Sequence, residues 1–205
     1  MLKRRIAVLV SGGGTNLQAI LDAVAGGDIP NAEVALIISS SADAYALERG
    51  RKAGVPGIVI DRASYPDTAE RTGAIIAALR AAGTELVVLA GYMNVLSPAL
   101  VKAFEKRIIN IHPSLIPRHC GKGYYGHHVH EAVLAAGDSE SGATVHFVDE
   151  GVDTGEIILQ ERVPVLPGDT AERLAARVLE VEHKILVRAA AQVLDALPCV
   201  ESGGC

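Results

Sequence analysis

The chain has 205 residues, of which 49% are hydrophobic and 21% charged, and its formal net charge is −5. This acidic balance argues against a nucleic-acid partner, and no apolar run approaches the roughly 18 residues that a membrane span needs. The three cysteines are too few and too widely spaced for a disulfide framework, so we expect a reduced, cytoplasmic protein without a membrane partner.

Short apolar runs alternate with helical segments through the first half of the chain. Because these runs are continuously apolar, they predict strands that are buried on both faces. Helix start signals lie between them: Asp67 and Glu70 match a capping box, and Ser97 precedes Pro98 as an N-cap. This rhythm predicts right-handed crossovers and a parallel sheet. The expected strands cover residues 5–10, 33–39, 57–60, 85–90 and 108–111.

A glycine-rich loop, "SGGGTNLQAI" at residues 11–20, follows the first strand and opens a helix. Backbone amides that no side chain shields, at the start of a helix, form a cradle for an anion. Thr15 and Asn16 add side-chain donors, so one interpretation is a phosphate site. The other is a tight turn that needs glycine for its conformation. Leu17 stands where a dinucleotide fingerprint has its third glycine, which argues against NAD.

The segment "NIHP" at residues 110–113 leaves the carboxyl end of the fifth expected strand, where ligands bind in open parallel sheets. Asn110 and His112 are two residues apart, so they point to one face if the strand continues through them. An amide can donate to a developing negative charge, and an imidazole can move a proton near neutral pH. The alternative is a histidine that only satisfies a hydrogen bond at the end of a strand.

Five histidine and cysteine side chains between residues 119 and 130 raise the question of a metal site. Zinc sites have paired ligands at tight, recurring spacings, and no second pair matches this run. Three of the histidines open an apparent helix, where we expect exposure to solvent. We therefore expect no metal. The five residues are His119, Cys120, His127, His128 and His130.

The second half changes character, because two expected strands, 143–148 and 155–165, follow one another without a helix. They predict an antiparallel strand pair. A long helix then runs from Asp169, its expected N-cap, to about Ala196. The turn between the strands holds Asp149, Glu150 and Asp153, and spacing alone does not choose among these acids.

The predicted fold class is thus α/β: a single Rossmann-like domain over residues 1–198, with residues 199–205 as a disordered tail. Its open, mostly parallel sheet is flanked by helices and carries the antiparallel C-terminal strand pair and the long C-terminal helix. The sequence does not indicate an oligomeric state.

Four segments together resemble the phosphoribosylglycinamide formyltransferases, also called glycinamide ribonucleotide transformylases, a family of folate-dependent formyltransferases. These segments are "SGGGTNLQAI", "AGYMNVLSP", "NIHPSLIP" and "GATVHFVDEGVDTGEIILQ", and the likeness spans residues 4–195. The resemblance implies two small-molecule substrates, 10-formyltetrahydrofolate as the formyl donor and phosphoribosylglycinamide as the acceptor, in de novo purine synthesis.

The resemblance also implies roles for particular residues. It selects Asp153 from the three acids and groups it with Asn110 and His112 as the catalytic trio. In that grouping the carboxylate of Asp153 is expected to raise the pKa of His112. The remaining implied contacts are Gly14, Thr15, Asn16 and Glu182 for the ribonucleotide, and Met93, Asn94, Val95, Leu96 and Asn110 for the folate. The loop from Pro117 to His130 is several residues longer than the family's common version.

Three other functions remain open. Methionyl-tRNA formyltransferase and formyltetrahydrofolate hydrolase share the Asn-x-His pattern, but the first is expected to carry a further C-terminal domain and the second an N-terminal regulatory domain. The third hypothesis is a module on the same scaffold that binds a nucleotide without catalysis, because a fold alone does not define a function. Such a module would not need an imidazole and a carboxylate at one reacting centre.

Overall fold

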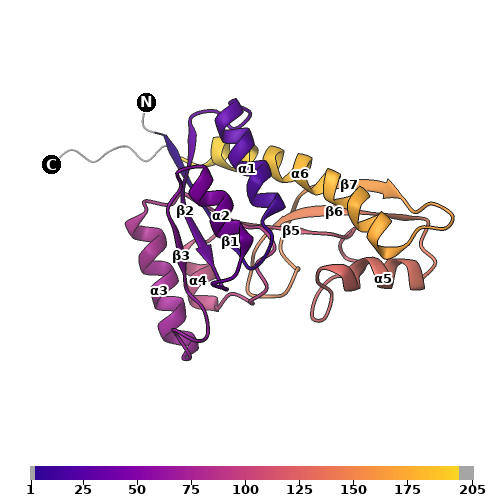
Figure 1. Cartoon of the computed structure of the whole chain (residues 1–205), viewed down its shortest axis with the longest axis horizontal. Helices are drawn as coiled ribbons and strands as arrows, with labels where there is room; N and C mark the ends of the chain where they lie inside the picture. Colours follow the sequence, from indigo (N-terminus) through magenta and orange to yellow (C-terminus); the bar gives the residue numbers. More distant parts are fainter. Residues whose placement is uncertain (1–2, 199–205) are drawn as a thin grey trace.

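A seven-stranded sheet forms the middle layer of the computed structural model, which describes residues 3–198 (Figure 1). The strand order is β3-β2-β1-β4-β5-β6-β7. Strands β1 to β5 run parallel, whereas β6 is antiparallel to both of its neighbours, β5 and β7. The predicted fold class is therefore confirmed, while the expected tail at 199–205 lies outside the described residues. The strands are β1 (Arg4–Val10), β2 (Ala32–Ser39), β3 (Gly57–Val59), β4 (Leu86–Leu89), β5 (Ile108–His112), β6 (Glu140–Phe147) and β7 (Ile157–Pro164).

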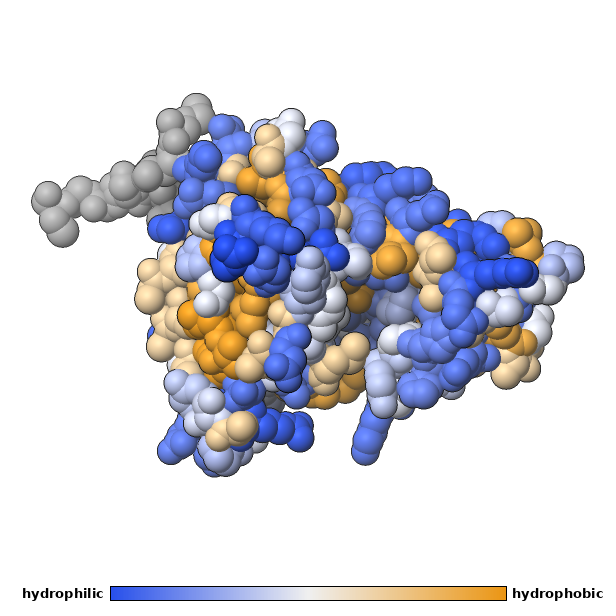
Figure 2. Space-filling view, viewed as in Figure 1, coloured by the Kyte–Doolittle hydropathy of each residue, from blue (hydrophilic) through white to orange (hydrophobic). Residues whose placement is uncertain are grey.

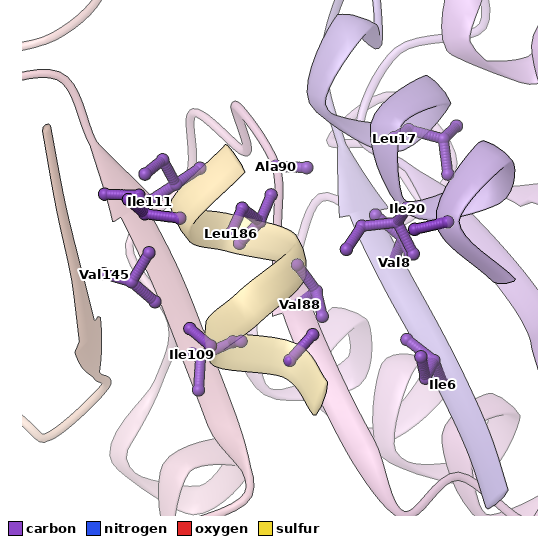
Figure 3. Close-up of a cluster of buried hydrophobic side chains, with 14 of the residues drawn as sticks. Ile6, Val8, Leu17, Ile20, Val88, Ala90, Ile109, Ile111, Val145 and Leu186 are labelled. Carbon is purple, nitrogen blue, oxygen red and sulfur yellow. The ribbon is translucent and has the colours of Figure 1, made fainter. Parts of the chain in front are cut away.

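Helices cover both faces of the sheet, because the strands are apolar on both sides. One core cluster joins α1 and α6 to the sheet, and a second joins α3 and α4 to the opposite face. Figure 3 shows Leu186 of α6 lying over Ile109 and Ile111, and Ile20 of α1 lying near Val8. No helix within residues 3–198 is both long and apolar enough to cross a membrane. The helices are α1 (Thr15–Gly26), α2 (Tyr45–Lys52), α3 (Thr68–Ala81), α4 (Pro98–Ala103), α5 (His127–Ala135) and α6 (Ala171–Ala196).

Two of the three predicted helix caps are confirmed. The side chain of Asp67 accepts hydrogen bonds from the first-turn amides of α3, and that of Ser97 accepts from the Leu100 amide. The expected cap at Asp169 is wrong, because Thr170 is the N-cap of α6. The Asp169 carboxylate instead accepts from the Leu166 amide and pairs with the Arg177 guanidinium at 2.7 Å, so it ties down the preceding turn.

Strand β6 begins three residues before the expected start at residue 143, and β7 is shorter at both ends than the expected 155–165. The segment Glu140–Gly142 has the composition of a turn, but Gly142 pairs with Arg162 across the ladder. A Cβ at Gly142 would lie 2.1 Å from the Glu161 carbonyl oxygen. Glycine at this position therefore permits the close approach of β7. Residues 140–142 consequently extend β6, although their composition is typical of a turn.

The switch point of the sheet lies between β1 and β4, because the chain winds outward in one direction from β1 and then returns to β4 on its other side. In open α/β sheets, ligands bind beyond the carboxyl ends of the strands at this point. The two connections that leave these ends are joined directly, since the Met93 amide donates a hydrogen bond of 2.9 Å to the Ser11 hydroxyl. The fold therefore brings the glycine loop and residues 93–96 to one edge.

Replacing Asp67 by alanine is expected to lower the free energy of unfolding by about 1 kcal/mol, because the amides of Ala69 and Glu70 lose their acceptor. Urea unfolding of the variant measures this change. Asp67 lies far from the strand ends of β4 and β5 in sequence and outside the cleft described below, so turnover should be unchanged. An unfolding free energy equal to that of the unaltered protein would contradict the cap.

Candidate active site

The structure brings Asn110, His112 and Asp153 together. Strand β5 continues through His112, so Asn110 and His112 share one face of the strand, as their spacing predicts. Asp153 comes from the loop between β6 and β7. The Asn110 Nδ2 atom lies 3.4 Å from Asp153 Oδ1, and the His112 Nδ1 atom lies 3.6 Å from Asp153 Oδ2. An amide donor, an imidazole and a carboxylate therefore meet at one point.

A fourth polar side chain, His146, belongs to this cluster and was missed in the sequence. It lies opposite Asn110 in the β5–β6 ladder. Its Nε2 atom is 3.2 Å from Asn110 Nδ2 and 3.5 Å from Asp153 Oδ1, and its Nδ1 atom donates to the Phe147 carbonyl. In the sequence it is one histidine within an apolar run. Only the antiparallel register places it beside the trio.

The hydrogen bonds of His112 fix which ring nitrogen carries its hydrogen. The Nε2 atom lies 2.9 Å from the backbone carbonyl oxygen of His119. A carbonyl oxygen can only accept, so Nε2 must be the protonated nitrogen of the neutral ring. The unprotonated Nδ1 of neutral His112 therefore faces the carboxylate of Asp153.

Asp153 raises the pKa of His112, as expected, but the net shift of the pKa of this imidazole is downward. Burial lowers the pKa of this imidazole, and His146 adds to that effect, whereas Asp153 and the His119 carbonyl oppose it without overcoming it. His112 is only 4% exposed, so its charged form loses most of its hydration. The neutral imidazole is consequently the resting form near neutral pH.

Asp153 keeps its charge although it is largely buried. Burial, the largest single influence, raises the pKa of this carboxyl, but the neighbouring His146, the nearby His112 and the Gly121 amide together hold the pKa below its ordinary value. The Gly121 amide donates to Asp153 Oδ2 at 2.9 Å. The site thus pairs an ionised carboxylate with an imidazole that is neutral at rest.

The trio opens onto a cleft of about 920 Å³, which is large enough for a cofactor-sized ligand. Figure 2 shows a recess between the larger half of the molecule, which carries α1 to α4, and the arm that carries α5. Met93 and Val95, which are exposed, give the cleft an apolar wall. Of the residues to which the resemblance gives a role, those that line it are Asn16, Met93, Asn94, Val95, Leu96, Asn110, His112, Asp153 and Glu182.

The glycine loop borders the cleft through Asn16, whereas Gly14 and Thr15 stand at the start of α1 just outside its lining. Gly14 has a φ of 72°, and a Cβ there would lie 2.6 Å from Ala46 Cβ, so packing and conformation both require glycine. Gly12 and Gly13 are different, since a Cβ at either would meet no atom within 4 Å. The conformation and packing of the turn therefore explain why residue 14 is glycine, but they do not explain why residues 12 and 13 are glycine.

Glu182 of α6 lines the cleft beside Asn16. It is 8% exposed, and its Oε2 atom accepts a hydrogen bond of 2.8 Å from the Asn16 amide nitrogen. Burial raises the pKa of this carboxyl, and the bond from Asn16 opposes the rise. A buried carboxylate with free lone pairs is suited to accept hydrogen bonds from the hydroxyls of a ligand.

The histidine-rich segment contains no clustered metal ligands, and none occurs elsewhere in residues 3–198. His127 contacts Glu172, and His128 contacts Glu131 on the surface of α5. The expected exposure of all three histidines in this helix is wrong for His130, which is 4% exposed. Helical periodicity turns this side chain inward, and burial lowers its pKa to about 4.

Comparison with known proteins identifies relatives over almost the whole chain. The sequence model of the formyl transferase family matches residues 4–190. A phosphoribosylglycinamide formyltransferase of Haemophilus influenzae is 46% identical over 182 residues, which are 89% of this chain and 83% of that protein. The trifunctional purine biosynthetic protein adenosine-3 of Drosophila pseudoobscura pseudoobscura is 45% identical over 92% of this chain, which corresponds to 14% of that longer protein. The crystal structure of glycinamide ribonucleotide transformylase 1 from Symbiobacterium toebii has a TM-score of 0.89 and 46% identity, covering 98% of this chain and 92% of that chain.

The buried His130 predicts a pH dependence of stability. Between pH 6.5 and about 4 the unfolded chain binds a proton at this position and the folded chain does not, so stability falls as the pH falls. At about 1.4 kcal/mol per pH unit, replacing His130 by glutamine should remove about 2–3 kcal/mol of the loss between about pH 7.5 and about pH 4.5. Urea unfolding at both pH values measures it.

The matched control for this experiment replaces His128, an exposed histidine of the same helix, by glutamine. This variant should keep the pH dependence of the unaltered protein. Equal pH dependence in both variants would contradict the burial of a neutral His130.

Proposed function

The chain belongs to the formyl transferase family, and on that premise we propose that it transfers a formyl group from 10-formyltetrahydrofolate to the amine of 5′-phosphoribosylglycinamide, a step of de novo purine biosynthesis. The observation that carries the proposal is the convergence of Asn110, His112 and Asp153 at the wall of a cleft of about 920 Å³. The folate and the ribonucleotide would meet in this cleft with the formyl carbon beside the trio.

In this proposal the amine of the ribonucleotide attacks the formyl carbon, and negative charge develops on the formyl oxygen. The Asn110 amide donates a hydrogen bond to that oxygen. Its present contacts, 3.2 Å to His146 and 3.4 Å to Asp153, are long, so a developing oxyanion competes well for the same hydrogens. Asn110 therefore stabilises the tetrahedral intermediate more than the substrate, which is what accelerates the reaction.

His112 and Asp153 move the proton. Because neutral His112 has its lone pair on Nδ1, this atom takes the proton that the attacking amine loses and delivers it to the folate nitrogen as that nitrogen leaves. Burial disfavours the imidazolium, and the ionised Asp153 beside Nδ1 offsets part of that cost. With Asp153 beside it, neutral His112 can act as a proton acceptor, and protonated His112 can then act as a proton donor.

Binding of the two substrates is assigned to two separate groups of residues around the cleft. The amides of Gly12 to Gly14 with Thr15 and Asn16 would hold the phosphate of the ribonucleotide, because packing does not require glycine at the first two positions. Glu182 would accept hydrogen bonds from the ribose hydroxyls. Residues Met93, Asn94, Val95 and Leu96 would hold the folate, with the apolar side chains of the three residues other than Asn94 against the ring system and the backbone groups of the segment as hydrogen-bonding partners.

Replacing His112 by alanine or Asp153 by asparagine is expected to reduce turnover about 100-fold or more, because the proton carrier or its counter-charge is lost. Release of tetrahydrofolate in the presence of the ribonucleotide measures turnover, and thermal melting checks that each variant is folded. The matched control is Glu150→Gln, which neutralises an exposed acid of the same loop. Turnover within threefold of the unaltered protein in the folded Asp153 variant would sink the assignment.

Replacing Thr15 by alanine should raise the KM for the ribonucleotide about 10-fold and leave the KM for the folate unchanged, because one donor to a charged phosphate is lost. Thr68→Ala is the control, since Thr68 likewise opens a helix, α3, which packs on the opposite face of the sheet from α1. Initial rates measured against each substrate separate the two constants. A rise confined to the KM for the folate would refute the phosphate assignment.

A further inference from the structure

The loop segment from Arg118 to Gly121 holds both titratable members of the trio through its backbone. The His119 carbonyl oxygen accepts from His112 Nε2 at 2.9 Å, and two residues later the Gly121 amide donates to Asp153 Oδ2 at 2.9 Å. These two bonds determine which nitrogen of His112 is protonated and where the carboxylate of Asp153 lies. Backbone groups can do this only if the segment itself is held in place.

His119 adopts an unfavourable backbone conformation, which contacts with other residues must stabilise. Its φ is 50°, in the left-handed region that residues other than glycine occupy at an energetic cost. Its side chain supplies such a contact, because Nε2 lies 2.7 Å from Asp138 Oδ2, and the two side chains are only 13% and 8% exposed. The Arg118 guanidinium contacts the other oxygen of Asp138. Two successive residues of the segment are thus tied to one carboxylate.

Asp138 is itself well anchored. It follows α5, and its backbone amide donates to the Val133 carbonyl at the end of that helix. The hydrogen bond from His119, followed by the charge of Arg118, lowers the pKa of the Asp138 carboxyl, so it is ionised at neutral pH. The far side of the segment is fixed too, because the Ser114 hydroxyl donates to the Arg118 carbonyl at 2.7 Å.

We propose that Asp138 and His119 are positioning residues, which hold the backbone of residues 118–121 so that its carbonyl keeps the hydrogen of His112 on Nε2 and leaves Nδ1 free toward Asp153. Neither side chain touches the trio through its own polar atoms; they act through the backbone groups between them. The proposal rests on the assignment of proton transfer to His112, and it assigns a role to His119 of the long loop.

The first test replaces Asp138 or His119 by alanine and measures both steady-state constants. Each variant should lower kcat about 10-fold or more and change the KM for either substrate less than about threefold, because the cleft remains but His112 is no longer fixed. His119→Gln should restore kcat to within about threefold, since a glutamine amide nitrogen reaches as far as Nε2 and also donates to Asp138. A loss of kcat in His119→Gln equal to that in His119→Ala would contradict the proposal.

The second test observes His112 directly. Nitrogen-15 NMR of histidine-labelled protein at neutral pH should find His112 in the Nε2-protonated form in the unaltered protein and in a mixture of both neutral forms in Asp138→Ala. Unchanged His112 signals in that variant would overturn the proposal. Because this readout needs no turnover, a protein that lacks formyl transfer but has the expected signals would refute the proposed function and leave the positioning role intact.

The matched control is Asp169→Ala, which breaks another ion pair with a largely covered carboxylate, that between Asp169 and Arg177, outside the cleft. It should lower the melting temperature to a similar extent and leave kcat unchanged. If Asp169→Ala and Asp138→Ala lower kcat equally at equal loss of melting temperature, Asp138 has only a structural role and the proposal fails.

Discussion

The antiparallel pairing of β5 with β6 is the constraint on which the rest of the site depends. It sets His146 opposite Asn110 and Thr144 opposite His112, so this antiparallel pair of strands, which adjoins the parallel part of the sheet, carries polar side chains on one face. Because β6 runs back against β5, the connection to β7 can cross over the same residues and deliver Asp153. A parallel β6 would need a long crossover and would place its own carboxyl end beside that of β5.

Burial and neighbouring charge shift the pKa values of His112 and Asp153 in opposite directions, and the resulting balance suits a proton carrier. His112 loses hydration and resists protonation, while Asp153 stays ionised because His146, His112 and the Gly121 amide support its charge. A histidine whose pKa was set by the carboxylate alone would be protonated at rest and could not accept a proton from an amine. The geometry instead sets the two groups 3.6 Å apart, close enough for the carboxylate to stabilise the imidazolium once it forms.

The sequence predicted those features that depend on local pattern. Apolar runs located the parallel strands, and the spacing of Asn110 and His112 placed both on one face, because a strand has a fixed period. Features that depend on contacts between distant segments were not predictable. His146 needs the β6 register, the inward turn of His130 needs the packing of α5, and the pairing of His119 with Asp138 spans 19 residues. The N-cap of α6 is Thr170 and not the predicted Asp169, whose carboxylate pairs with Arg177, a contact that the sequence pattern does not indicate.

The most direct test of the account follows tetrahydrofolate release from 10-formyltetrahydrofolate by the unaltered protein, with and without phosphoribosylglycinamide. The account predicts turnover that depends on the ribonucleotide, with one formylated product for each tetrahydrofolate released. Release at the same rate without the ribonucleotide would identify water as the acceptor and contradict the account. Absence of release from protein that melts cooperatively would contradict it as well, and would favour a module that binds a nucleotide without chemistry.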